Sequence, residues 1–220
     1  MRWPFFMFYQ LFISVYLNMN YLGHLYFSEN NKDLMIANLY GDYFKGNKYD
    51  ELPLLQRTGV KLHRAIDDFI DTNKGVKELF KELYADLPKI AGIAVDLYFD
   101  HLLAKHWSQF HNRKLENFVS DFYAHTELIN YPYPEQFLHM IHYMKQGDWL
   151  LNYKYLEGLD SAARGLSRRI SFPNELYKAK EVFVKNEELI TNHFFSYMQE
   201  AVDNFYLPDS QKLLNFNLKS

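Results

Sequence analysis

Residues 90–107 read IAGIAVDLYFDHLLAKHW, a mostly apolar segment that begins just after Pro88. A buried segment of this length is typical of a helix, because strands in globular proteins seldom exceed about ten residues. Proline is tolerated at the start of a helix, where its missing N–H would have no partner anyway. We therefore expect residues 90–107 to form a helix at the centre of the fold.

Helical spacing continues on both sides of this segment. Pro53 opens a run in which Leu62, Ile66 and Ile70 recur every four residues, the spacing of one helix face. No convincing strand pattern is present, and nine glycines and seven prolines are few breaks for 220 residues. We therefore predict an all-α fold. Further helices are expected at 32–40, 115–128, 134–144, near 149, up to about 170 and over 175–205. The expected core positions of the last helix are Val182, Val184, Leu189, Ile190, Phe194 and Phe195.

The composition limits the classes of function. With 48% apolar residues, the chain is long enough to bury a core as one domain, and its net charge of −3 argues against a nucleic-acid partner. The absence of cysteine excludes disulfides, thiolate zinc sites and cysteine nucleophiles, and it fits a reducing compartment such as the cytoplasm. Any metal must be held by histidine and carboxylate, which favours Mn²⁺, Mg²⁺ or Fe²⁺.

The N-terminal segment 1–18, MRWPFFMFYQLFISVYLN, allows three interpretations. A signal peptide is one, but the segment has a single arginine and no small-residue cleavage site. A membrane span is another, although the segment is short and contains Gln10, Ser14 and Asn18. We favour an extension upstream of a natural start at Met19, with no stable membrane association. The expected organisation is then an extension (1–18), a helical catalytic domain (19–206) and a tail (207–220).

The decapeptide LHRAIDDFID, residues 62–71, places ionisable groups on a helix that is otherwise buried. His63 and Asp67 are four residues apart, so they lie about 40° apart on one face and can approach a common ion. Asp71 continues the row, and Arg64 lies about 100° to one side. The alternative is a solvated acidic face with a hydrogen bond between His63 and Asp67.

A second group of ionisable residues lies within the central helix. Asp96 and Asp100 share a face at i, i+4, where two carboxylates repel unless a cation lies between them. His101 follows directly, and both Asp100 and His101 can reach one metal site over the arc between them. The alternative places Asp96 on the surface and makes His101 a core histidine bonded to a carbonyl group.

Two residues near the start of the chain add weaker signals. His24 lies in the apolar run NYLGHLYFS, and Asp42 follows Gly41 where a helix should end. A lone histidine on an apolar face usually packs in the core, and an aspartate after glycine usually caps or turns the chain.

Trp107 and Trp149 are expected in the core. Phosphate-binding loops, GxSxG and dinucleotide glycine motifs are absent.

Six segments, taken in order, resemble the acyl carrier protein phosphodiesterase (acyl carrier protein hydrolase) family. The resemblance runs from about residue 19 to residue 170. It implies a helical fold like that of an atypical branch of the HD-domain phosphohydrolases, which hold divalent metal with His and Asp. It also implies hydrolysis of the phosphodiester that joins 4'-phosphopantetheine to a serine of holo acyl carrier protein, supported by manganese. The segments are NYLGHLYFS, NLYGDYFKGN, GVKLHRAIDDFID, AVDLYFDHLLAKHWS, DWLLNY and GLSRRI.

The resemblance also implies roles for individual residues. The usual His-Asp dipeptide of HD proteins is not obvious, since the doublet in this chain is Asp100-His101, so the exact ligands and the number of ions stay open. Asp42, Arg64 and His106 are the expected catalytic residues, with Arg64 clamping a phosphate oxygen and His106 protonating the leaving group; the alternative for His106 is packing. The expected metal shell is His24, Asp42, His63, Asp67, Asp100 and His101.

The implied protein substrate is acidic, so a locally basic docking surface is expected. Arg164, Arg168 and Arg169 in and before GLSRRI are the expected contacts. The alternative is that these cations only complement the dipole at a helix C-terminus. Two other functions stay open from the sequence: a phosphohydrolase acting on a nucleotide or another small phosphoester, and a non-catalytic helical protein that binds an acidic partner.

Overall fold

A computed structural model describes residues 20–28 and 31–205 of the chain. Within these ranges every regular element is helical and no strand occurs, so the prediction of an all-α fold is confirmed. The expected extension (1–18) and tail (207–220) lie outside the described residues. None of the described helices is long and apolar enough to span a bilayer.

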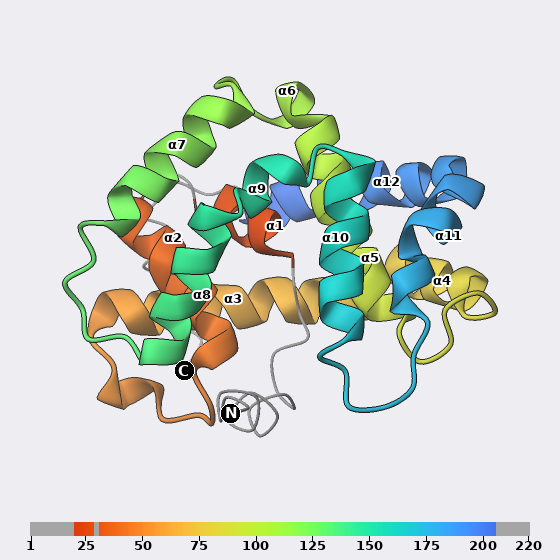
Figure 1. Ribbon diagram of the computed structural model, residues 1–220. Helices are drawn as coiled ribbons and strands as arrows, with labels where there is room; N and C mark the ends of the chain where they lie inside the picture. The colour runs from red at the N-terminus through yellow and green to blue at the C-terminus, as the bar shows by residue number, and fades with distance from the viewer. Residues whose placement is uncertain (1–19, 29–30, 206–220) are drawn as a thin grey trace, which may run out of the picture.

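The helices follow one another through short connections, several of them with 3-10 geometry (Figure 1). Four 3-10 or α-helical segments precede the long α3, and the C-terminal half ends in the long α12. The bounds are α1 Tyr21–Tyr26, α2 Lys32–Leu39, η2 Tyr40–Tyr43, η3 Tyr49–Glu51, α3 Leu54–Thr72, α4 Lys74–Leu83, α5 Ala91–Lys105, α6 Trp107–Phe110, α7 Leu115–Thr126, α8 Glu135–Gln146, α9 Trp149–Asn152, α10 Leu156–Ser167, η4 Leu176–Lys178, α11 Ala179–Lys185 and α12 Glu187–Phe205.

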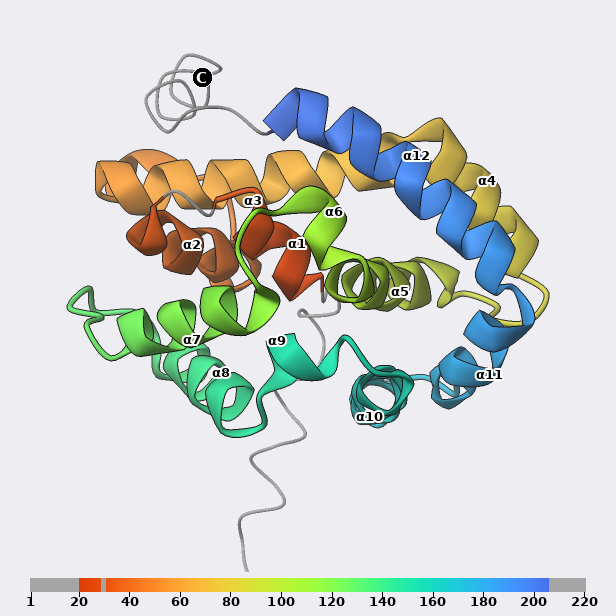
Figure 2. The same ribbon diagram turned by 90° about the horizontal axis from the view of Figure 1, so that it is seen from above.

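The expected central helix is α5, which is buried on every side over residues 94–104. It packs against α1, α4, α10 and α12, and these helices surround it in the view from above (Figure 2). A helix that is apolar all round needs such neighbours, because no face of it is suited to water. Apolar burial on α5 thus fixes the positions of the surrounding helices.

Helix α3 is amphipathic and lies along α2 over much of its length. The two helices approach closely at Gly59, where a Cβ atom would lie 2.4 Å from the carbonyl carbon of Ala37. Helix α1 is placed between α3 and α9 in Figure 2. This arrangement brings α1, η2 and α3 to one place near the centre of the molecule.

The expected single helix over 175–205 is wrong, because the chain breaks into η4, α11 and α12. At the second break, the side-chain amide of Asn186 donates to the carbonyl of Val182, and this local bond competes with helix continuation. Val184 is 54% exposed, so it is not a core residue, whereas Val182, Ile190 and Phe194 are buried. Helix α4 was not expected; its N-terminus is capped by the Asn73 side chain, which accepts from the N–H of Val76.

Candidate metal centre

Three neighbouring elements bring four ionisable side chains together. His24 comes from α1, Asp42 from η2, and His63 and Asp67 from successive turns of α3. Gly41 allows η2 to lie directly against α3, because a Cβ atom there would lie 2.2 Å from Cγ of His63. The close packing of η2 on α3 at this site thus depends on a residue without a side chain.

The distances define a compact cluster. Nε2 of His63 lies 3.2 Å from an oxygen of Asp42 and 3.2 Å from Oδ2 of Asp67. Nε2 of His24 lies 3.2 Å from the other oxygen, Oδ1, of Asp67. The two imidazole rings are stacked with their centroids 4.0 Å apart. His24, His63 and Asp67 each present one ligand atom within 4.8 Å of the others, as one metal ion would require.

The tautomer of His24 follows from its hydrogen bonds to Asn38. The Asn38 amide nitrogen donates to the carbonyl of His24 and to Oγ of Ser28. Its amide oxygen is therefore the acceptor that lies 3.0 Å from Nδ1 of His24, so Nδ1 carries the proton. Nε2 then has a free lone pair directed at Asp67. A histidine oriented by a hydrogen bond from its other nitrogen is the usual arrangement of a metal ligand.

The ionisation of the cluster reflects its burial and its charges. Burial and the neighbouring His63 lower the pKa of His24, which keeps that ring neutral. Burial alone would lower the pKa of His63, but Asp42 and Asp67 raise it to about 10. Burial would likewise raise the pKa of Asp67, but the two imidazoles beside it hold the pKa well below its usual range. The cluster therefore combines a neutral His24, a protonated His63 and an ionised Asp67, and a cation that binds Nε2 of His63 displaces its proton.

The donor atoms fit a divalent ion. Nε2 of His24 and Oδ1 of Asp67 are buried acceptors that face each other with no hydrogen bond between them. Two such acceptors repel unless a proton or a metal ion lies between them, and a neutral His24 supplies no proton at that atom. Imidazole and carboxylate ligands suit Mn²⁺, Fe²⁺ and Zn²⁺, and a second carboxylate, Asp42, is adjacent.

Asp100 and His101 have partners outside this group. The carboxylate of Asp100 accepts from the backbone N–H groups of Leu22 and Gly23 at 3.0 and 2.9 Å, so it binds the N-terminus of α1. Burial raises the pKa of Asp100 to about 8, against the lowering effect of these two bonds. Nδ1 of His101 lies 2.7 Å from the carbonyl oxygen of Tyr153. The structure thus favours the alternative of a core histidine bonded to a carbonyl, whereas Asp96, which that alternative placed on the surface, is buried.

Arg64 and His106 also have local partners. Arg64 donates to the hydroxyl of Tyr49 and to the carbonyl of Phe44, and its guanidinium lies over both rings. It therefore holds the segment between η2 and η3 against α3. His106 ends α5, where its ring packs against Phe195 and its Nδ1 lies 3.3 Å from the side-chain nitrogen of Gln109.

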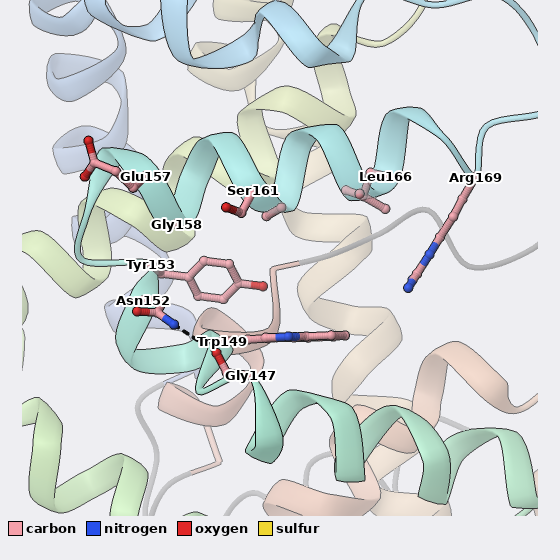
Figure 3. Close-up of a pocket in the computed structure, with 11 residues that line it drawn as sticks. Gly147, Trp149, Asn152, Tyr153, Glu157, Gly158, Ser161, Leu166 and Arg169 are labelled. Atoms are coloured by element: carbon pink, nitrogen blue, oxygen red, sulfur yellow. Dashed lines mark hydrogen bonds between the residues drawn. The ribbon is translucent and has the colours of Figure 1, made fainter.

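The three arginines expected to dock a partner differ from one another. Arg164 forms an ion pair with Asp160 one turn earlier, at 2.9 Å. Arg168 and Arg169 are exposed and have no ion pair within the described residues. Arg169 also borders a pocket of about 380 Å³ between α9 and α10 (Figure 3).

Sequence reasoning missed this pocket, although its walls include the segment DWLLNY and the GLSRRI motif. Trp149, expected in the core, is only half-buried and forms one wall, whereas Trp107 is buried. The missed signal is a pair of aromatic residues four positions apart on a short helix. The pocket is lined by Gly147, Trp149, Asn152, Tyr153, Glu157, Gly158, Ser161, Ala162, Gly165, Leu166 and Arg169.

Comparison with known proteins extends the resemblance seen in the sequence. The family model described as acyl carrier protein phosphodiesterase matches residues 19–201. Curated proteins named acyl carrier protein phosphodiesterase from Escherichia coli strains K12 / DH10B, SE11 and O157:H7 EC4115 are each 27% identical over 154 residues. These matches cover 69% of this chain and 79% of each relative. No solved structure matches the chain, so the likeness to HD-domain proteins stays a prediction.

Proposed function

The chain belongs to the acyl carrier protein phosphodiesterase family, and from this premise we propose that it removes 4'-phosphopantetheine from holo acyl carrier protein with the help of a divalent cation. The products would be apo carrier protein and 4'-phosphopantetheine. The observation that carries the proposal is the facing pair of buried acceptors, Nε2 of His24 and Oδ1 of Asp67. A cation between them satisfies both groups and lies where the family's chemistry needs a positive charge.

We propose His24, His63 and Asp67 as the ligands of this cation, with Asp42 as the fourth protein group beside it. A divalent ion bound there would lower the pKa of a coordinated water molecule and neutralise negative charge on the phosphate oxygens. Mn²⁺ is the preferred ion because the family resemblance implies it, and Mg²⁺ and Fe²⁺ are alternatives that imidazole and carboxylate donors can also hold. Asn38 orients His24 through Nδ1 and thereby keeps Nε2 free for the ion.

Asp42 is the group best placed to accept a proton from the attacking water. Its carboxylate is partly accessible and lies 3.2 Å from Nε2 of His63, beside the three expected ligands. We assign Asp100 a positioning role, because its two bonds to the start of α1 fix the helix that carries His24. Arg64 holds the loop after Asp42 through Phe44 and Tyr49, so its contribution to phosphate binding would require that it leave these partners.

Recognition of the carrier protein is assigned to the exposed cations at the end of α10. Arg168 and Arg169 have no ion pair within the described part of the chain, so their charge is available to an acidic partner. Arg164 is already paired with Asp160 and contributes less. Arg168→Glu, which reverses the charge at this position, should therefore reduce the rate of association with the carrier protein. The association rate should also depend less on the salt concentration.

The proposal is tested by incubating the purified protein with holo acyl carrier protein and Mn²⁺ and measuring the mass of the carrier protein. We expect loss of the mass of phosphopantetheine, and no loss in EDTA. His63→Ala and Asp67→Ala should abolish turnover while the helix content measured by circular dichroism is kept. Asp68→Asn is the matched control, since Asp68 is the exposed neighbour of Asp67 on α3 and should leave turnover intact. Failure with Mn²⁺, Mg²⁺ and Fe²⁺, together with turnover of a nucleotide, would overturn the proposal.

A further inference from the structure

The pocket between α9 and α10 is built close to the metal centre but separate from it. It has a volume of about 380 Å³, and Trp149 and Tyr153 extend into the space below α10 (Figure 3). Gly158 allows α10 to cross the end of α9 closely, because a Cβ atom there would lie 1.9 Å from the carbonyl oxygen of Asn152. The crossing of α9 and α10, between which the pocket lies, is therefore fixed by backbone packing.

The hydroxyl of Tyr153 indicates that the pocket receives a hydrogen-bonding ligand. Tyr153 is only 2% exposed, and its hydroxyl has no hydrogen-bond partner within the described residues. The side chain points along the pocket between α10 and Trp149 (Figure 3). A buried hydroxyl without a partner is unfavourable, and a ligand that bonds to it removes this penalty. The carbonyl of Tyr153 is anchored to α5 by His101, so the ring is held in place.

Tyr21 connects the pocket to the metal centre. Its ring is stacked on Trp149, with centroids 6.4 Å apart, and it begins α1, the helix that carries His24. Burial raises the pKa of Tyr21, Asp42 raises it further, and Arg169 lowers it. Tyr21 thus lies between Trp149, which lines the pocket, and the helix that carries His24, so the pocket and the metal centre are neighbours.

The lining suits an uncharged, flexible chain with amide groups. Trp149, Ala162 and Leu166 provide apolar surface, and Tyr153, Asn152 and Ser161 provide hydrogen-bonding groups among them. The two charged residues of the lining, Glu157 and Arg169, are exposed and lie at opposite ends of the pocket (Figure 3), so its middle part is uncharged. Pantetheine has this chemistry: a dimethyl carbinol, two amides and a terminal thiol, joined to a phosphate at one end.

We propose that this pocket binds the pantetheine arm of the substrate while the phosphodiester lies at the metal centre. This assignment rests on the proposed function, because it takes the arm to be part of the substrate. Tyr153 is a specificity residue that bonds to an amide of the arm, and Arg169 lies toward the phosphate end. The pocket explains how the enzyme distinguishes a phosphopantetheine diester from other phosphodiesters.

Gly165 provides a clean way to block the pocket. It lines the pocket on α10, and a Cβ atom at this position meets no heavy atom within 4 Å among the described residues. Gly165→Leu therefore fills the pocket without disturbing the backbone, and Gly165→Ala is the matched variant that leaves the space open. Both replacements raise helix propensity, so neither should unfold the protein.

The test compares two substrates and one ligand. For holo carrier protein, Gly165→Leu should lower kcat/KM at least about tenfold relative to Gly165→Ala, a change of about 1.4 kcal/mol. Methyl p-nitrophenyl phosphate, a diester without the arm, reports on the metal centre and should lose no such factor. Pantetheine without phosphate should bind wild type in a calorimetric titration, and at least tenfold more weakly to Gly165→Leu and to Tyr153→Phe.

The outcomes separate this inference from the proposed function. Equal pantetheine affinity in Gly165→Leu and Gly165→Ala, or no binding to wild type, would overturn the assignment of the pocket, and turnover of holo carrier protein would then still support the function. An equal loss of kcat/KM for both diesters in Gly165→Leu would also overturn it, since the replacement would then have disturbed the metal centre or the fold and not the binding of the arm. If wild type fails to act on holo carrier protein but binds pantetheine through Tyr153 and the space at Gly165, the function is wrong and the pocket assignment stands.

Discussion

Asp67→Asn separates metal binding from packing at the centre, because the replacement has the same shape and no charge. In the wild type, Oδ1 of Asp67 faces the unprotonated Nε2 of His24 at 3.2 Å, and we propose that a cation bridges them. In the variant, the side-chain amide nitrogen takes the place of Oδ1 and donates to Nε2 of His24. The amide oxygen takes the place of Oδ2, which in the wild type lies 3.2 Å from Nε2 of His63. The variant should therefore lose the metal and keep the fold.

The magnitudes follow from linkage between binding and folding. At a Mn²⁺ concentration about 100 times the dissociation constant, the wild type gains about 2.7 kcal/mol. For a chain of 220 residues this raises Tm by about 5–10 °C. If the variant binds the ion about a hundredfold more weakly, the same concentration supplies about 0.4 kcal/mol and a shift of about 1 °C. The new hydrogen bond to His24 contributes about 1 kcal/mol, which offsets the lost charge interaction with His63.

The assay is thermal unfolding followed by circular dichroism, in EDTA and in MnCl₂. We expect wild type and Asp68→Asn to show the full metal-dependent shift, and Asp67→Asn to show almost none. In EDTA, the three proteins should have free energies of unfolding within about 1 kcal/mol of one another. A full Mn²⁺ shift in Asp67→Asn would refute the assignment of Asp67 as a ligand. A metal-free variant that unfolds many degrees below the wild type would show that the carboxylate serves the fold instead.

Three further predictions concern the residues around the centre. Gly41→Ala places a Cβ atom 2.2 Å from Cγ of His63, so it should displace that ring and weaken Mn²⁺ binding in a calorimetric titration, and unchanged affinity would contradict the geometry. Asp100→Ala leaves the N–H groups of Leu22 and Gly23 without an acceptor and should lower the free energy of unfolding by about 1–3 kcal/mol for each, measured with urea, while Asp100→Asn should fall in between. In EDTA, the raised pKa of His63, about 10 against 6.5 in the unfolded chain, gives stability that is complete below pH 6.5 and lost as the pH rises toward 10. Urea unfolding across this range should show the decline, and His63→Gln should remove it; a pH-independent wild type would argue against a protonated His63.

The spacing of residues along the chain correctly predicted that His63 and Asp67 on α3 lie together. It did not predict the partners of Asp100 and His101 on α5. His63 and Asp67 lie 3.2 Å apart because a spacing of four residues on a helix fixes their distance before any tertiary contact forms. Asp100 and His101 lie on a helix that is buried all round, so the apolar pattern gives no indication of which neighbour each side chain meets. Packing directs Asp100 to the start of α1 and His101 to the end of α9.

The sequence by itself determined the helical class, the face shared by His63 and Asp67, and the family, since these depend on local periodicity and on ordered motifs. Only the tertiary structure decided that His24 meets them while Asp100 and His101 have other partners, that Asn38 fixes the tautomer of His24, and that a pocket opens beside Trp149. Each of these depends on contacts between segments far apart in the chain. Such contacts are set by how apolar faces and close glycine approaches fit together in space, and no local pattern of residues encodes them.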